Sequence, residues 1–167
     1  MTSRVRDRRG GRLTALDGVL LHSPEFADGW NSMLGAVRGK STLPPDIREL
    51  AILRVAQRNG ADYEWVAHEP VARQAGLTEE QLVSIRTEDP GPGLAMLSAA
   101  QLAALAYADA MTTGVRVPDE VLGEVQEHFD DRQVLELTVT VATYNMVSRV
   151  LVALEVRPGD DPFAGLT

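Results

Sequence analysis

The sequence predicts an all-α, single-domain helical bundle, and three features support this prediction. Apolar residues recur at intervals of three and four along most of the 167-residue chain, as they do on the buried face of a helix. Capping residues precede these segments, and glycine or proline separates them. No alternating strand pattern and no fixed-period repeat occurs. The chain is long enough for one sizeable core, and no change in composition divides it.

The first helices are marked by their boundaries. Residues 13–21 are expected to form a short helix, and Ser23 with Pro24 should begin a second one that ends near Arg38. The apolar residues of that second helix predict a single buried face, and they are Phe26, Trp30, Met33, Leu34 and Val37.

Residues 43–76 predict a helical hairpin at the centre of the fold. Its first helix follows Pro44 and Pro45 and ends where Asn59 and Gly60 form a turn. Asp62 is expected to cap the second helix, which ends at Gly76.

The C-terminal half predicts four further helices. A capping-box spacing at Thr78 begins a helix that ends near residue 86, and residues 87–93 form a loop rich in proline and glycine. Ser98 caps an alanine-rich helix to about residue 113, and Pro118 opens the next, to about residue 129. The last helix, residues 131–156, is apolar nearly all round. Either a subunit interface or burial within one subunit would explain that composition.

Composition limits the partners and the location. The net charge of −8 and the isoelectric point near 4.8 argue against binding to nucleic acid or an anionic membrane. Without a long apolar run or a signal peptide, we expect a cytoplasmic protein. The absence of cysteine excludes disulfides, thiolate metal sites and thiol nucleophiles. We expect a flexible arginine-rich arm over residues 1–12, a helical domain over 13–156 and a loosely held tail over 157–167.

The hairpin carries the candidate catalytic residues. Glu49 lies eleven residues before Gly60 and His68 eight residues after it, so antiparallel helices would bring the two to a similar height. Glu64 is four residues before His68 and therefore on the same helix face. We predict that His68 is a general acid or base, that Glu49 orients it, and that Glu64 is a second acid. The alternative is a surface Glu-His pair with Glu49 as an ordinary first-turn acid.

Other residues are candidates for substrate binding. Tyr63 and Trp65 flank Glu64 along the chain, His22 precedes the second helix, and Tyr144 and Asn145 interrupt the apolar last helix. Each also has an ordinary structural explanation, such as capping for His22, core packing for Trp65 and a subunit contact for Tyr144 and Asn145. Arg48 and Arg54 are possible carboxylate binders, with solvated pairing to nearby acids as the alternative. Two carboxylates and a histidine also suit a metal ion, but we predict no metal.

The hairpin resembles the carboxymuconolactone decarboxylase superfamily, which includes the alkylhydroperoxidase D-like (AhpD-like) proteins. The resemblance is carried by RELAILRVAQRNGADYEWVAHEPVARQAGLTEEQL, with weaker similarity over most of the chain. In the hydroperoxidase branch a glutamate precedes Cys-x-x-Cys-x-x-x-His by twelve positions. Glu49 and His68 match that glutamate and histidine, whereas Ala61 and Glu64 stand at the cysteine positions. Peroxide reduction needs those thiols, so a thiol peroxidase is excluded.

The decarboxylase branch is similar in carrying Glu-x-x-x-His without cysteines, matched here by Glu64 and His68. The resemblance implies an all-α fold, a trimer or hexamer of identical subunits, no organic cofactor, and a site near subunit contacts. It predicts a cofactor-free lyase of the decarboxylase type, acting on a small carboxylated or lactone substrate. The alternative is a non-catalytic oligomeric binding protein that keeps the fold.

Overall fold

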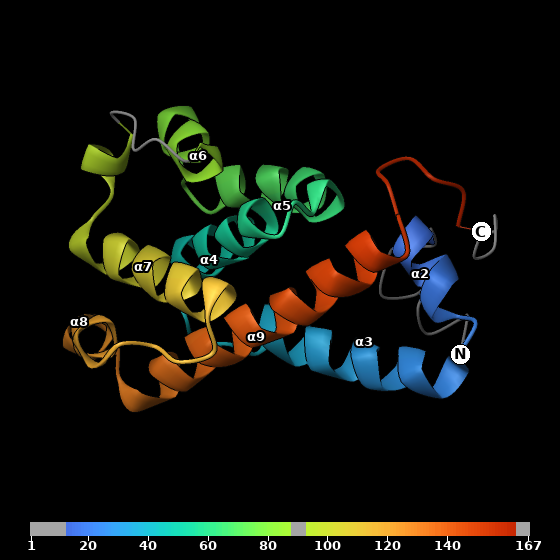
Figure 1. The fold of residues 1–167 in the computed structure, drawn as a ribbon, viewed down its shortest axis with the longest axis horizontal. Helices are drawn as coiled ribbons and strands as arrows, with labels where there is room; N and C mark the ends of the chain where they lie inside the picture. Colours follow the sequence, from blue (N-terminus) through green and yellow to red (C-terminus); the bar gives the residue numbers. More distant parts are fainter. Residues whose placement is uncertain (1–12, 88–92, 163–167) are drawn as a thin grey trace.

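The computed structural model describes residues 13–87 and 93–162, and the regular elements within them are helical (Figure 1). The all-α prediction is confirmed. The expected arm over residues 1–12 and most of the loop over 87–93 lie outside the described residues. The elements are α2 (Ala15–Leu20), α3 (Pro24–Gly39), α4 (Pro45–Arg58), α5 (Asp62–Gln74), α6 (Glu79–Arg86), the 3-10 helix η1 (Leu94–Met96), α7 (Ala99–Thr113), α8 (Asp119–His128) and α9 (Asp131–Ala153).

Helix α4 is the centre of the bundle. It packs against α5, α6, α7 and α9, which lie around it in Figure 1. Leu50, Ile52, Leu53 and Val55 are fully buried, although they point in different directions around the helix. Full burial of each such side chain contributes about 1.5–3 kcal/mol, so α4 is held from several sides. It therefore provides a rigid support for any polar group that it carries.

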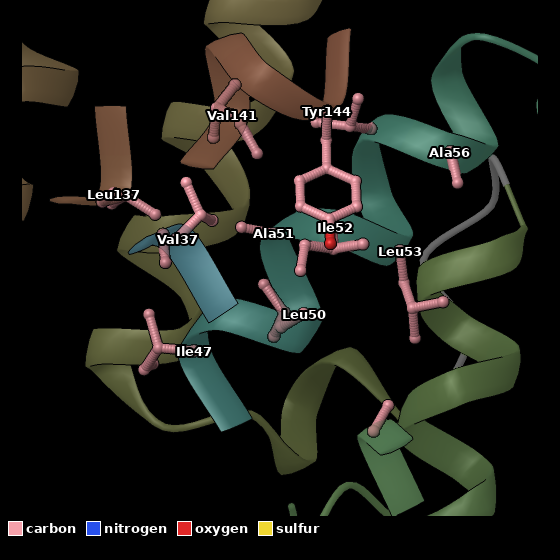
Figure 2. Close-up of a cluster of buried hydrophobic side chains, with 14 of the residues drawn as sticks. Val37, Ile47, Leu50, Ala51, Ile52, Leu53, Ala56, Leu137, Val141 and Tyr144 are labelled. Atoms are coloured by element: carbon pink, nitrogen blue, oxygen red, sulfur yellow. The ribbon is translucent and has the colours of Figure 1, made fainter. Parts of the chain in front are cut away.

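Helix α9 buries only one of its faces within the chain. Leu137, Val141 and Tyr144 point from α9 into the apolar layer beside α4 (Figure 2). On the outer face, Leu135 is 62% and Val152 49% exposed. Burial inside one subunit therefore does not account for the apolar composition of this helix, and a subunit interface stays a prediction.

The expected buried face of α3 is partly wrong. Trp30, Leu34 and Val37 are buried, but Phe26 is 57% and Met33 39% exposed. At about 100° per residue, the three buried positions lie within one arc, and Phe26 and Met33 fall beyond its edge. Apolar residues at intervals of three and four thus cover a wider arc of α3 than the arc that packs against the rest of the chain.

The helix boundaries follow local capping chemistry. Capping boxes at Thr78, Ser98 and Asp130 begin α6, α7 and α9. Asp62, however, is the first residue of α5 and not its cap, which is Ala61. Gly60 has a φ of 64°, the left-handed conformation that the turn between α4 and α5 requires.

The chain after α9 returns toward α2. A methyl group at Gly18 would overlap the backbone of Pro162, whose carbonyl oxygen would lie 1.7 Å from it. The described part of the tail therefore passes close to α2, at a position where only glycine fits. No helix in the described part of the chain is long and apolar enough to cross a membrane.

Candidate active site

Glu49 and His68 meet in the interior. The tight turn after α4 sends α5 back along it, and His68 Nδ1 lies 2.7 Å from Glu49 Oε2. His68 is 5% and Glu49 2% exposed. The alternative of a surface pair is thus wrong, and the spacing argument placed the two side chains correctly.

The neighbours of His68 identify its tautomer. Nε2 lies 3.2 Å from Arg38 Nη2 and 3.1 Å from the Tyr144 hydroxyl. A guanidinium can only donate, so Nε2 accepts and the ring proton is on Nδ1, where it is donated to Glu49. The Tyr144 oxygen accepts a hydrogen bond from Arg38 Nε at 2.7 Å, which leaves its own proton directed at Nε2. His68 is therefore a neutral imidazole with its basic nitrogen facing two donors.

The charges around the pair agree with this tautomer. Burial lowers the pKa of His68, and the positive charges of Arg38 and Arg48 lower it further, against the opposing effect of Glu49. Burial raises the pKa of Glu49, but hydrogen bonds and charge from His68 and Arg48 outweigh it, so the net shift is downward. Arg48 Nε donates to Glu49 Oε1 at 3.2 Å. At neutral pH the pair is a carboxylate beside a neutral imidazole.

Glu64 is separate from that pair. Its Oε2 accepts a hydrogen bond from Ser148 of α9, while its buried Oε1 has no hydrogen-bond partner among the described residues. Burial raises the pKa of Glu64 to about 8, although Ser148 and Arg38 oppose the shift. Glu64 is thus a neutral acid at pH 7, and its role as a second acid stays a prediction. Within residues 13–87 and 93–162, no three histidine and acidic side chains are placed to hold one metal ion.

We call the hydrogen-bonded group of Glu49, His68, Tyr144 and Arg38, together with the neighbouring pair of Glu64 and Ser148, the cluster. The sequence did not identify two of its members. Arg38 comes from the end of α3, thirty residues before His68, and nothing in its local pattern distinguishes it from a surface arginine. Ser148 follows Tyr144 by four residues and is 0% exposed. A second polar residue on the same face of an otherwise apolar helix was a usable signal for Ser148.

Of the predicted substrate-binding residues, Tyr144 alone joins this hydrogen-bonded cluster, where it is fully buried. Tyr63 is partly buried and lines a different pocket of about 350 Å³ between the start of α5 and the end of α9. Asn145 bonds to Asn59 at 3.1 Å, away from His68. Trp65 is a core residue, 3% exposed, and His22 is exposed in the turn before α3.

Arg54 pairs with an acid, but the explanation that this pair is solvated is wrong. It is 7% exposed, and two of its nitrogens donate to the two carboxylate oxygens of Asp109 at 2.6 and 2.8 Å. A third donates to the Ile85 carbonyl at 2.9 Å. Arg54 therefore ties α4 to α6 and α7, and has no role in the cluster around His68.

Comparisons with known proteins agree with this fold. The carboxymuconolactone decarboxylase family model matches residues 24–110. The uncharacterized protein YdfG of Bacillus subtilis (strain 168) is 29% identical over 117 residues, which are 69% of this chain and 78% of YdfG. A protein of unknown function from Agrobacterium tumefaciens, for which an AhpD-type antioxidant role has been suggested, superposes with a TM-score of 0.74 at 22% identity. That match covers 84% of this chain and 94% of the other.

A further solved structure is the debrominase Bmp8, as a cysteine-to-alanine variant in complex with 2,3,4-tribromopyrrole. It superposes with a TM-score of 0.69 at 16% identity, over 86% of this chain and 75% of the debrominase. These structural likenesses show a shared AhpD-like helical fold. Because the family model spans just over half of the sequence, including α4 and α5 with Glu49 and His68, this chain belongs to the carboxymuconolactone decarboxylase family.

Proposed function

We propose that this protein is a cofactor-free enzyme that moves a proton on a small carboxylated or lactone substrate, as a lyase of the decarboxylase type. The observation that carries the proposal is the hydrogen-bonded chain from Glu49 through His68 to Tyr144. A carboxylate that fixes the tautomer of a neutral histidine leaves a base at Nε2, which is the arrangement required for general acid-base catalysis.

The same groups suit a reaction through an enolate. Loss of carbon dioxide breaks a carbon–carbon bond and leaves its electron pair on the neighbouring carbonyl as an enolate, which needs stabilisation and then a proton at carbon. Tyr144 and Arg38 present donors beside Nε2 for the developing negative charge. Glu64, held as a neutral acid, is a source of the proton. In lactone opening by elimination, His68 instead removes a proton from the carbon next to a carbonyl, the released electron pair forms a double bond to the adjacent carbon, and the ring oxygen leaves that carbon as a carboxylate.

The test is turnover of a panel of β-keto acids and unsaturated lactones by the wild-type protein and by two isosteric variants, Glu49→Gln and His68→Asn. Each variant should lose about 10²–10⁴-fold in kcat/KM, the usual contribution of one positioned acid or base. Each should still unfold cooperatively on heating, which shows that its core is intact. A matched control is Glu69→Gln, on the same helix as His68 but outside the cluster. Equal turnover in wild type and both variants would refute the catalytic role.

A second candidate function is a non-catalytic binding protein, and one observation favours it. Glu49, His68 and Tyr144 are at most 5% exposed, and none of them lines the described pockets between α5 and α9, α3 and α9, or α7 and α8. A closed, hydrogen-bonded cluster is also a means of specifying a unique core. If no substrate class is turned over and Glu49→Gln destabilises the fold, this structural explanation is the better one.

A further inference from the structure

Arg38 differs from the other buried or partly buried arginines of the bundle in having no acidic partner. Arg48 pairs with Glu49, and Arg54 with Asp109. None of the ion pairs among the described residues includes Arg38, although it is partly buried. A cation in that position without a carboxylate retains an unsatisfied preference for an anion.

The hydrogen bonds of Arg38 leave donors unused. Its Nε donates to the Tyr144 hydroxyl and one Nη2 hydrogen faces His68 Nε2. A guanidinium carries five N–H groups, so three remain without an acceptor among the described residues. The charge of Arg38 acts on the carboxyl of Glu64, but the one hydrogen bond of that carboxyl among the described residues is to Ser148 and not to the guanidinium. The protein thus presents the paired N–H donors of a guanidinium, a fork that can bind both oxygens of a carboxylate, but it does not pair them with a carboxylate of its own.

Arg38 is the neighbour of the base that lies nearest to solvent. Nε2 of His68 has two polar neighbours, Tyr144, which is 0% exposed, and Arg38, which reaches the surface. The Arg38 guanidinium lies 5.7 Å above the Tyr144 ring, at the outer side of the cluster. Since Tyr144 is fully buried, a molecule that approaches Nε2 from solvent on the Arg38 side meets the guanidinium first.

From these contacts we propose that Arg38 is the anion-binding residue of the site: a carboxylate of the substrate pairs with its guanidinium, draws the Nη2 donor away from His68 Nε2, and so frees the base. This inference rests on the proposed function and narrows its substrate to a small anion whose reacting carbon lies within one or two bonds of a carboxylate. Arg38 touches the substrate in this scheme, and its bond to Tyr144 keeps the fork oriented.

The experiment uses formate, the smallest carboxylate, as the probe, and the full-length chain labelled with ¹⁵N. Sodium formate is added against sodium chloride at equal ionic strength, and the His68 Nε2 resonance is followed at several pH values. In the wild type, the resonance should shift to saturation. The midpoint of the His68 titration should also rise, because a bound anion neutralises the Arg38 charge.

Three variants separate the possible causes. Arg38→Gln should abolish the saturable shift, and Arg38→Lys, which keeps the charge but not the fork, should bind formate about tenfold or more weakly. Arg86→Gln, an arginine that stacks on Trp65 at 5.0 Å outside the cluster, should respond like the wild type. A wild type without a saturable response, or an Arg38→Lys variant with unchanged affinity, would overturn the assignment. The readout is independent of turnover, so formate binding at Arg38 with an inactive panel would refute the catalytic proposal alone.

Discussion

Replacing the buried acid Glu64 with glutamine should make the protein more stable at alkaline pH. Glu64 is 2% exposed and its pKa is raised to about 8 from 4.5, with burial as the main cause. Between these two pH values the folded chain keeps a proton that the unfolded chain has lost. The free energy of unfolding of the wild type therefore decreases as the pH rises from about 4.5 to about 8.

The magnitude follows from the size of the pKa shift. Each pKa unit corresponds to 1.36 kcal/mol, so the loss is about 3 kcal/mol at pH 7 and about 5 kcal/mol above pH 8. Glutamine has nearly the same shape and does not titrate, and its amide oxygen can still accept the bond from Ser148. The difference in unfolding free energy, variant minus wild type, should thus rise by about 1.4 kcal/mol per pH unit and level off above pH 8.

Urea unfolding at half-unit steps from pH 4.5 to 9 measures this difference, at one protein concentration because subunit association would add to stability. Trp30 and Trp65, 6% and 3% exposed, report the transition by fluorescence. Glu25→Gln, which replaces an exposed acid on α3, is the matched control. If the free energies of unfolding of Glu64→Gln and wild type change with pH in parallel, Glu64 ionises normally in the folded protein and the reasoning is refuted. If the difference, variant minus wild type, falls as the pH rises, Glu64 is instead a carboxylate in a buried ion pair.

Three other changes test the surroundings of the site. Arg54→Met should destabilise the protein by about 3 kcal/mol, which is the lower end of the range for a broken buried ion pair, because a second arginine still contacts Asp109. Denaturant unfolding of this variant and of Asp109→Asn measures the effect. Gly18→Ala should destabilise by about 1–3 kcal/mol through overlap with the Pro162 backbone, and the effect should vanish in a chain that ends at residue 157. Finally, ¹⁵N spectra at pH 7 should show that His68 is neutral and carries its proton on Nδ1. The second ring nitrogen should take up a proton only below the ordinary pKa of 6.5. A doubly protonated ring at pH 7 would contradict the assigned tautomer.

The positions of Glu49 and His68 could be predicted because the geometry between them is local. Two regular helices joined by a turn of known length have fixed rises per residue, so counting from Gly60 placed the pair within about one helical turn of each other. The capping box at Thr78 and the cap at Ser98 were predicted for the same reason, since each depends on four consecutive residues.

The remaining features depend on contacts between distant segments. The hydrogen-bond partner of Glu64 could not be predicted, because its carboxyl bonds to Ser148, eighty-four residues later. Likewise, the pairing of Arg38 with Tyr144 spans 106 residues. Helical periodicity gives the direction of a side chain around its own axis, but not which neighbour lies in that direction.

By itself, then, the sequence determined the helices, the hairpin and the hydrogen-bonded carboxylate and imidazole within it, since these follow from repeat spacing and local capping. Tertiary structure alone decided that side chains are buried all round α4, that Glu64 is buried against Ser148 and that an arginine from α3 covers the basic nitrogen of His68. Burial and donor–acceptor geometry arise only when the helices pack, and they set the charge of every group in the cluster.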